Sequence, residues 1–198
     1  METTKAPPAI AGLSYNIHSE ETASSDSKPF LAGARAKFGF VPNLLGVMAD
    51  APALLQSYLT LAGLFDKTSL SPTERQIVLL ATSYSNGCAY CMAAHTAIAG
   101  MQDVPKDVVE ALRNNTVLAN AKLEALRIFA YEIAQNRGYP SPEILARFFA
   151  AGYNKAQALE VVLGVGLKTI SNYTNHLTAI PLDAEFSAVK WEDARGVD

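Results

Sequence analysis

The residues best suited to chemistry lie in one short segment, Asn86 to His95, which reads NGCAYCMAAH. It holds both cysteines of the chain, Cys88 and Cys91, and one of its three histidines. Cysteines at this spacing on a helical turn share one face and can close a small disulfide. His95 lies four residues beyond Cys91, one turn further along that face, where an imidazole can accept the thiol proton. The segment therefore predicts a dithiol with its own proton acceptor, which suits thiol–disulfide exchange or peroxide reduction.

The expected position of Cys88 favours a thiolate there. Asn86-Gly87 reads as a turn, so Cys88 falls in the first turn of the next helix. Unpaired backbone N–H groups and the helix dipole stabilise an anion at that end. A thiol in such a place can have its pKa lowered from about 8.5 to roughly 3.5–7.5. We therefore expect Cys88 to ionise readily.

Three other interpretations of these residues remain open. Both cysteines could be inert small hydrophobic side chains in a core, and His95 could be a hydrogen-bonded core histidine. The segment could also hold zinc, but Cys88, Cys91 and His95 supply only three ligands. His18 and His176 lie far away in the sequence, and neither is an obvious fourth ligand. We therefore expect no metal and no cofactor.

Helical periodicity runs through most of the chain, and no segment reads convincingly as a strand, so the predicted fold class is all-α. One helix start is well marked, because Ser71-Pro72-Thr73-Glu74 combines a cap, a proline and a capping-box glutamate. The expected helices cover Lys28–Phe38, a short segment from Pro42-Asn43, Pro52–Phe65, Ser71 to about Tyr84, a helix from near Cys88, one from Asp103 to Pro105 onward, Lys122–Arg137, Pro142–Ala151 and about Lys155–Leu177.

Length and composition favour one helical domain over residues 28–183, flanked by two other segments. Residues 1–27 contain Pro7-Pro8 and a Ser/Asp/Glu-rich run, so we expect a loosely ordered arm. Residues 184–198 read as an extended C-terminal tail. The chain has 198 residues, of which 49% are hydrophobic and only 18% charged, which makes self-association plausible.

Charge and hydropathy exclude several partners. A net charge of −3 argues against nucleic acid and anionic membranes, which need a basic patch. Residues 77–102 contain no charged side chain and are long enough to span a bilayer. Ser-Tyr-Ser-Asn-Gly interrupts this stretch, however, so two buried helices are expected instead. Because the N-terminus shows no signal core, we expect a cytoplasmic protein whose thiols are reduced at rest.

A faint internal repeat has an offset of 84 residues. Gln76 to Leu80 followed by Cys88-Ala-Tyr-Cys91 aligns with Glu160 to Gly164 followed by Asn172-Tyr-Thr-Asn175. If the repeat is genuine, it predicts two related helical hairpins around a pseudo-twofold axis. Asn172 to His176 could then line the site from the second half, or could instead cap the helix or form a hydrogen bond between subunits. Gly164 and Gly166 predict close helix packing, for which a subunit contact is one expected place.

Two segments carry a family resemblance: Leu70-Ser-Pro-Thr-Glu-Arg-Gln-Ile-Val-Leu-Leu and Asn86-Gly-Cys-Ala-Tyr-Cys-Met-Ala-Ala-His95. The chain resembles the AhpD-like, alkylhydroperoxidase-type branch of the carboxymuconolactone decarboxylase superfamily, from about Phe40 to Asp183. The resemblance implies an all-α fold of paired helical units and a homo-oligomer (dimer, trimer or hexamer). It also implies a peroxidatic Cys91, a resolving Cys88 and proton transfer by His95.

One position departs from the family pattern. The family's proton-relay glutamate lies twelve residues before the first cysteine, where this chain has Gln76. Glutamine can hydrogen-bond to His95 but cannot accept a proton. Glu74 should face away from the site as a capping residue. Tyr90, between the cysteines, is expected to pack rather than to gate the site.

Together these observations predict a thiol-dependent peroxidase that reduces a hydroperoxide, an organic one given the apolar surroundings. His95 would deprotonate Cys91, the peroxide would oxidise Cys91 to a sulfenic acid, and Cys88 would condense with it to a disulfide. An external dithiol would then reduce that disulfide. The alternative is a non-enzymatic oligomeric helical protein whose dithiol senses redox state or is a relic, and Gln76 favours that alternative.

Overall fold

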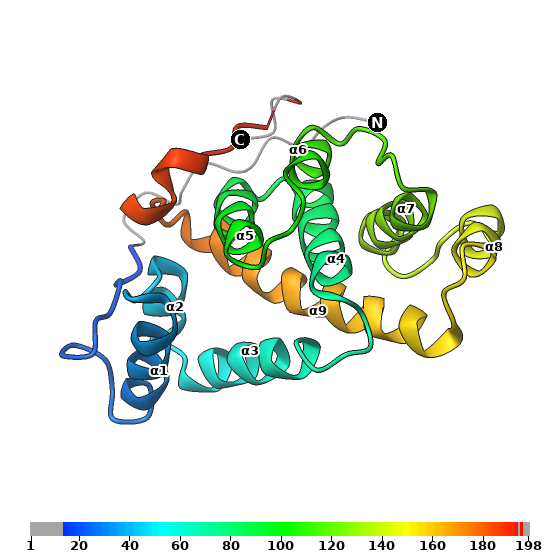
Figure 1. The fold of residues 1–198 in the computed structure, drawn as a ribbon. Coiled ribbons are helices and arrows are strands. Elements are labelled where there is room, and N and C mark those ends of the chain that lie inside the picture. The colour runs from blue at the N-terminus through cyan, green and yellow to red at the C-terminus, as the bar shows by residue number, and fades with distance from the viewer. Residues whose placement is uncertain (1–13, 194, 196–198) are drawn as a thin grey trace.

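The structure is a computed structural model that describes residues 14–193 and residue 195 (Figure 1). In these residues the chain is all-α, without a strand, which confirms the predicted fold class. The helices are α1 Lys28–Phe38, α2 Asn43–Met48, α3 Pro52–Phe65, α4 Pro72–Ser85, α5 Ala89–Met101, α6 Lys106–Asn114, α7 Ala121–Gln135, α8 Pro142–Ala150 and α9 Lys155–Thr178, followed by a 3-10 segment, η1, at Ala184–Val189.

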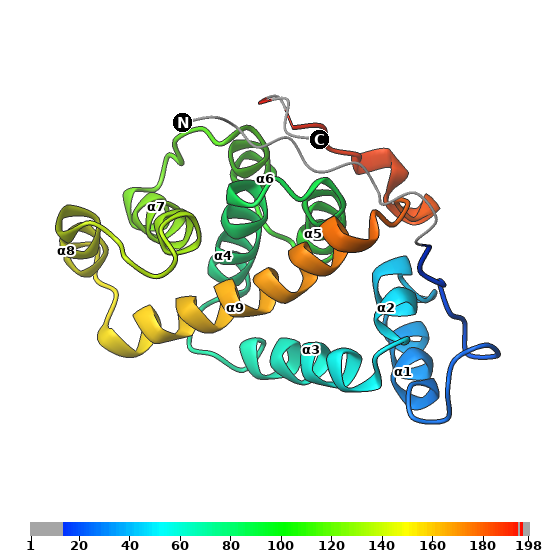
Figure 2. The same ribbon diagram turned by 180° about the vertical axis from the view of Figure 1, so that it is seen from behind.

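Helix α4 lies at the centre and packs against α5, α7 and α9. The long helix α9 also packs along α3 and crosses behind α4, as the two opposite views show (Figures 1 and 2). One cluster of buried hydrophobic side chains fills the space around α4, α7 and α9. A second cluster joins α1, α2, the start of α5 and the C-terminal segment, and it contains both cysteines.

The predicted start of α4 is confirmed in detail. The Ser71 hydroxyl accepts a hydrogen bond from the Glu74 N–H, and the Ser71 N–H donates to Glu74 Oε2 at 2.8 Å, which completes the capping box. Glu74 also accepts a hydrogen bond from the Tyr153 hydroxyl at 2.9 Å. These contacts hold Glu74 at the far end of α4 from the cysteines.

The turn between α4 and α5 also forms where it was predicted. Gly87 has φ 67°, in the left-handed region where glycine has no steric penalty. Cys88 follows as the N-cap of α5, with φ −87° and ψ 94°. Cys91 is therefore the third residue of α5, and His95 lies one turn further on.

The two flanking segments differ from their prediction. The residues after Pro181 form η1 instead of an extended tail, and Phe186 and Trp191 are buried against the helices. Within the predicted arm, residues 20–27 include turns, and Ala23 and Ser27 are buried. Residues 1–13 lie outside the described part of the chain. Scattered aromatic and small side chains in polar segments gave too little periodicity to predict this packing.

The proposed second hairpin is also wrong, because its residues belong to one continuous helix. Asn172 and Asn175 lie inside α9, whereas Cys88 follows a break in the chain. The position equivalent to Gly87 is Ser171, which stays helical. The described part of the chain contains no helix long and apolar enough to cross a membrane.

The two glycines of α9 have different environments, which gives a matched test of packing. A Cβ on Gly164 would lie 2.7 Å from atoms of Phe65 and Val78, so the close contact predicted there is within the chain. A Cβ on Gly166 would meet nothing within 4 Å. We expect Gly164→Ala to lower the free energy of unfolding by about 1–3 kcal/mol through overpacking. Gly166→Ala should be neutral or stabilising by up to about 1 kcal/mol.

Urea unfolding of both variants measures the difference. Equal free energies of unfolding for the two would mean that α9 does not approach Phe65 as closely as described.

Candidate active site

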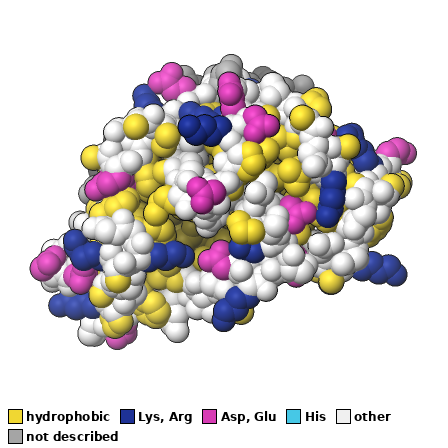
Figure 3. All heavy atoms as spheres, in the orientation of Figure 1, with side chains coloured by type: hydrophobic (Ala, Val, Ile, Leu, Met, Phe, Trp, Pro, Cys, Tyr) yellow, Lys and Arg dark blue, Asp and Glu magenta, His cyan; other side chains and the backbone are white. Residues whose placement is uncertain are grey.

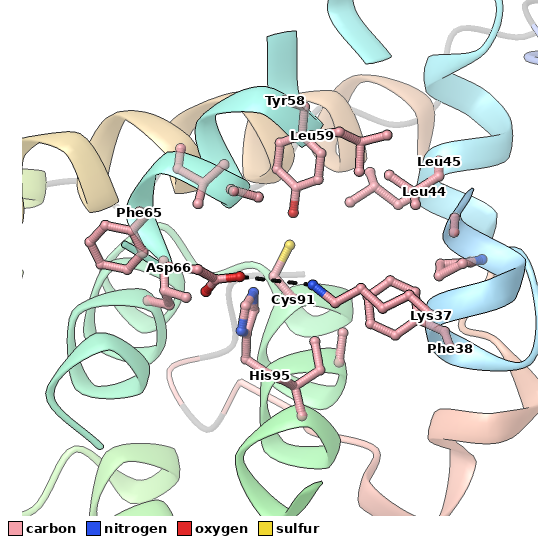
Figure 4. Close-up of a pocket in the computed structure, with 18 of the residues that line it drawn as sticks. Lys37, Phe38, Leu44, Leu45, Tyr58, Leu59, Phe65, Asp66, Cys91 and His95 are labelled. Atoms are coloured by element: carbon pink, nitrogen blue, oxygen red, sulfur yellow. Dashed lines mark ion pairs between the residues drawn. The ribbon is translucent and has the colours of Figure 1, made fainter. Parts of the chain in front are cut away.

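A pocket of about 390 Å³ opens beside Cys91. Residues from α1, α2, α3, the second and third turns of α4, α5 from its first turn onward and the middle of α9 line it, and most of their side chains are apolar. Hydrophobic side chains surround a hollow on this face (Figure 3). Cys91, His95 and Tyr58 point into the same space (Figure 4). The structure thus places two of the predicted site residues, Cys91 and His95, at one pocket.

The two cysteines occupy different positions relative to this pocket. Both are reduced and buried, with 0% of Cys88 and 1% of Cys91 exposed. Each side chain shifts the pKa of the other. Cys91 lines the pocket and Cys88 does not. A substrate in the pocket therefore meets the Cys91 sulfur first, with the Cys88 thiol directly behind it.

Of the two thiols, Cys91 has the lowered pKa, whereas the sequence predicted that Cys88 would ionise more readily. Burial by itself raises the pKa of Cys91, but the Cys88 thiol, the Lys168 ammonium and hydrogen bonds from Asn172 and Ser171 outweigh it and lower the pKa to about 6. Burial and the neighbouring Cys91 raise the pKa of Cys88 well above its usual range. The surroundings of the pair therefore favour a thiolate on Cys91 and a protonated thiol on Cys88.

Lys168 is the main site residue that sequence reasoning missed. It lies in the middle of α9, is only 1% exposed and lines the pocket together with Cys91, where its positive charge lowers the pKa of the Cys91 thiol. The only sequence signal was a lysine inside the apolar run from Val161 to Ile170. Such a residue more often lies on a solvated helix face, so its type alone did not identify it.

Polar side chains of the same helix complete the surroundings of the cysteines. The Ser171 hydroxyl lies 3.9 Å from the Cys91 sulfur, and Asn175 Nδ2 donates to the Cys88 sulfur at 3.6 Å. Asn172 Oδ1 accepts a hydrogen bond from Asn86 Nδ2 at 2.8 Å, which ties α9 to the turn before Cys88. The expectation that Asn172 and its neighbours line the site thus agrees with the structure, although His176 does not reach the pocket.

His95 is held by Gln76, the residue at the relay position. Gln76 Nε2 donates to Gln102 Oε1 at 3.0 Å, so its Oε1 faces His95 and accepts from His95 Nδ1–H at 3.0 Å. This assigns the proton to Nδ1 and leaves Nε2 as an acceptor. Burial, and then the charge of Lys168, holds the pKa of His95 well below its usual range, so the ring is neutral.

The described residues contain no hydrogen bond between His95 and Cys91. They also contain no group of three or more His, Cys, Asp or Glu side chains placed to hold a metal ion.

Tyr90 and Glu74 have structural roles. The buried Tyr90 hydroxyl donates to Asp183 Oδ2 at 2.5 Å and accepts from the Leu44 N–H at 3.3 Å. Asp183 Oδ1 accepts from the Asn43 N–H at 2.8 Å, so Tyr90 joins α5, α2 and the C-terminal segment. Glu74 does not line the pocket. Tyr58, which the sequence did not single out, directs its hydroxyl toward Cys91 (Figure 4).

Known proteins share part of this sequence and the fold. Residues 50–131 match the carboxymuconolactone decarboxylase family. The comparison with curated proteins found no match. The fold is similar to the alkylhydroperoxidase AhpD core of a peroxidase-related protein from Ralstonia eutropha JMP134, with a TM-score of 0.76 and 20% identity over 87% of this chain and 93% of that one. A peroxidase-related protein from Silicibacter sp. TM1040 gives 0.74 and 20%, over 93% and 97%.

The fold is equally similar to the debrominase Bmp8, in which a cysteine is replaced by alanine and 2,3,4-tribromopyrrole is bound. That comparison gives a TM-score of 0.76 and 18% identity over 91% of this chain and 96% of that one. At these identities the solved structures establish the fold, while the family match covers α3 to most of α7, including both cysteines and His95. The family match over residues 50–131 and the shared fold thus agree with the resemblance of the sequence to the AhpD-like branch of the carboxymuconolactone decarboxylase superfamily.

Proposed function

We propose that this protein is a thiol-dependent peroxidase that reduces organic hydroperoxides through Cys91 and Cys88. The observation that carries the proposal is the position of the Cys91 sulfur, at the wall of an apolar pocket and close to the buried Cys88 thiol, in surroundings that lower the pKa of Cys91 to about 6. The thiolate is the nucleophilic form of cysteine. The adjacent thiol lets a sulfenic acid resolve to a disulfide before further oxidation.

The reaction then proceeds in three steps. The Cys91 thiolate attacks the terminal peroxide oxygen, the O–O bond breaks, and the alkoxide takes up one proton to leave as an alcohol. The Cys88 thiol condenses with the Cys91 sulfenic acid, forming the disulfide and releasing water. An external dithiol returns two electrons and two protons to the protein and is itself oxidised to a disulfide.

The neutral imidazole of His95 changes the role expected for this residue. Because Cys91 has a pKa of about 6, it needs no base to ionise at pH 7. His95 Nε2 instead can accept a hydrogen bond from the O–H of the hydroperoxide, while Gln76 fixes the ring orientation through Nδ1. His95 thus orients the terminal oxygen toward the Cys91 sulfur.

The pocket favours a compact apolar substrate. Leu44, Leu45 and Leu59 line its wall, and an ion pair between Lys37 and Asp66 at 3.8 Å crosses it in front of Cys91 (Figure 4). A small aryl or alkyl hydroperoxide matches these walls, whereas a protein substrate would have to part α1 from α3. We therefore use cumene hydroperoxide as the probe.

Intact mass measurement of the fully reduced protein tests the proposal. One equivalent of cumene hydroperoxide should remove two hydrogens from the protein within seconds, and a dithiol should restore them. Thiols that remain reduced for many minutes would contradict the peroxidase proposal. They would favour the non-enzymatic alternative, a redox sensor or structural protein.

A second candidate is reductive debromination of a small bromoarene. Two observations support it. The Cys91 thiolate faces apolar walls that suit an aromatic ring, and the debrominase of similar fold binds such a ring, 2,3,4-tribromopyrrole. The thiolate would take bromine from carbon while the carbon accepts a proton, and Cys88 would then displace bromide to form the same disulfide. Bromide release from 2,3,4-tribromopyrrole by the reduced protein, compared with its rate of peroxide reduction, ranks the two activities.

The reaction should depend on pH through Cys91. Because the thiolate reacts and its pKa is about 6, the rate of Cys91 oxidation by cumene hydroperoxide should rise as pH increases through 6 and be level above pH 7. Rapid quench followed by mass measurement between pH 5 and pH 9 gives this profile. A rate that still climbs between pH 8 and pH 9 would show an ordinary thiol.

The expected self-association stays a prediction. Exposed apolar side chains follow one face of α9 at helical spacing, and this face is consistent with a contact between copies of the chain. They are Leu159, Val162, Tyr173 and Leu177.

A further inference from the structure

We propose that Lys168 is a catalytic residue whose ammonium group first holds Cys91 as a thiolate and then donates its proton to the departing alkoxide. The inference rests on the proposed peroxidase function and deepens it. It gives the reaction its acid, which neither the cysteine pair nor the neutral His95 provides. It also explains how a site with Gln76 at the relay position can ionise its thiol.

The positive charge of Lys168 is isolated from carboxylates. Its side chain is buried in α9, and no carboxylate in the described part of the chain forms an ion pair with it. The titratable groups around it are Cys88 and Cys91, with Tyr58 from α3 and His95 from α5. A buried ammonium without an anionic partner is unfavourable, so one of these groups must supply the negative charge.

Cys91 is that partner. Lys168 and Cys91 line the same pocket, and among the titratable groups around Lys168 the charge of Cys91 raises its pKa most strongly. Cys88 and Tyr58 both have raised pKa values through burial, so they remain protonated and neutral. Lys168 and Cys91 therefore form a buried ammonium–thiolate pair, in which each charge depends on the other.

The acidity of Lys168 follows from that dependence. Burial lowers the pKa of Lys168, and the charge on Cys91 reverses this effect and raises it. Attack on the peroxide converts the thiolate into a neutral sulfenic acid and so removes the anion. The burial effect is then unopposed, and Lys168 becomes a stronger acid at the moment when the alkoxide needs a proton. Lys168 and Cys91 line the same pocket, so the ammonium is within reach of a peroxide bound there.

The step balances. The thiolate, the ammonium and the hydroperoxide become a sulfenic acid, a neutral amine and an alcohol, with Cys91 oxidised and the peroxide reduced. Condensation with Cys88 releases water. The two protons from the external dithiol then return to Cys88 and Lys168. The other nearby groups are poorer donors, because His95 Nδ1–H is bound to Gln76 and the pKa of Tyr58 is raised.

The test compares Lys168→Met, which keeps the length and packing of the side chain, with Lys37→Met as a control. Lys37 lines the same pocket but is 65% exposed, and it pairs with Asp66. Two properties are measured: the pH titration of thiolate absorbance in the ultraviolet, and the rate of Cys91 oxidation by two oxidants. Cumene hydroperoxide releases an alkoxide, which needs a proton, whereas peracetic acid releases acetate, which does not.

We expect Lys168→Met to shift the thiolate titration to higher pH and to slow reaction with cumene hydroperoxide at least about 100-fold at pH 7. At a pH where the variant's thiol is fully ionised, its rate with peracetic acid should approach the wild-type rate, while its rate with cumene hydroperoxide stays low. Lys168→Arg should keep the low pKa of the Cys91 thiol but should not donate a proton to the alkoxide. Lys37→Met should match the wild type in the titration.

An unchanged titration in Lys168→Met would overturn the thiolate role, and equal losses with the two oxidants would overturn the acid role. Circular dichroism confirms that each variant is folded before either rate is compared. The titration needs no peroxide, so it tests the thiolate role of Lys168 even if the wild-type protein does not react with peroxide. Wild-type thiols that resist both oxidants would instead refute the proposed peroxidase function and, with it, the acid role.

Discussion

Cys91→Ser is expected to abolish oxidation by hydroperoxide altogether, while Cys88→Ser should still react once. The difference arises because the peroxide meets the Cys91 sulfur in the pocket, whereas Cys88 lies behind it and has a raised pKa. In Cys88→Ser the Cys91 sulfenic acid has no thiol to condense with, so the protein should gain one oxygen atom. In Cys91→Ser, Cys88 remains a buried, protonated thiol, and no change of mass should follow.

Intact mass after one equivalent of cumene hydroperoxide distinguishes the two variants, and a sulfenic-acid trap applied to Cys88→Ser identifies the oxidised residue. The Cys88→Ser rate should be below that of the wild type, because the Cys88 thiol helps to lower the pKa of Cys91. Oxygen gained by Cys91→Ser at the wild-type rate would reverse the assignment of the two cysteines.

Local sequence signals were sufficient for the helices and for two members of the site. The capping box at Ser71 and the glycine after Asn86 act within a few residues, so their effect on the backbone can be read without knowing the fold. Because those signals place Cys91 and His95 one helical turn apart, their shared direction into the pocket could be predicted as well.

The charge of the site could not be predicted in the same way. The helix-end argument favoured Cys88, because it considers only groups that are close in sequence. The structure places the charge on Cys91, since Lys168, Ser171 and Asn172 all come from α9. A contact between distant helices depends on the way they pack. The same limit explains why Phe186 and Trp191 were missed, because their burial depends on surfaces formed by other elements.

At Gln76 the family resemblance predicts the position of the side chain correctly but not its charge. The resemblance identified the position, and the structure shows that the side chain does contact His95, with Gln76 Oε1 3.0 Å from Nδ1. Glutamine keeps the orienting hydrogen bond of a relay residue but supplies no negative charge. The charge that a relay glutamate would provide is absent, and Lys168 stabilises the thiolate by a separate route.

Gln76→Glu is therefore expected to accelerate Cys91 oxidation by about tenfold at pH 7, below the roughly 10²–10⁴-fold range of full general acid–base catalysis. A carboxylate beside Nδ1 opposes the burial effect and the Lys168 charge that hold the pKa of His95 low. A more basic imidazole accepts the hydroperoxide hydrogen bond more strongly. The buried carboxylate is accommodated because the Gln102 amide can rotate and present its N–H groups to it.

A double-mutant comparison separates this route from a general effect of added charge. The gain measured for Gln76→Glu by rapid quench and mass measurement should disappear in a His95→Gln background, because the carboxylate acts only through the imidazole. If the gain persists there, the new charge acts directly on the Cys91–Lys168 pair. A rate of thiol oxidation that Gln76→Glu leaves unchanged in the wild-type background would mean that the relay position has no part in this chemistry, and that the thiolate depends on α9 alone.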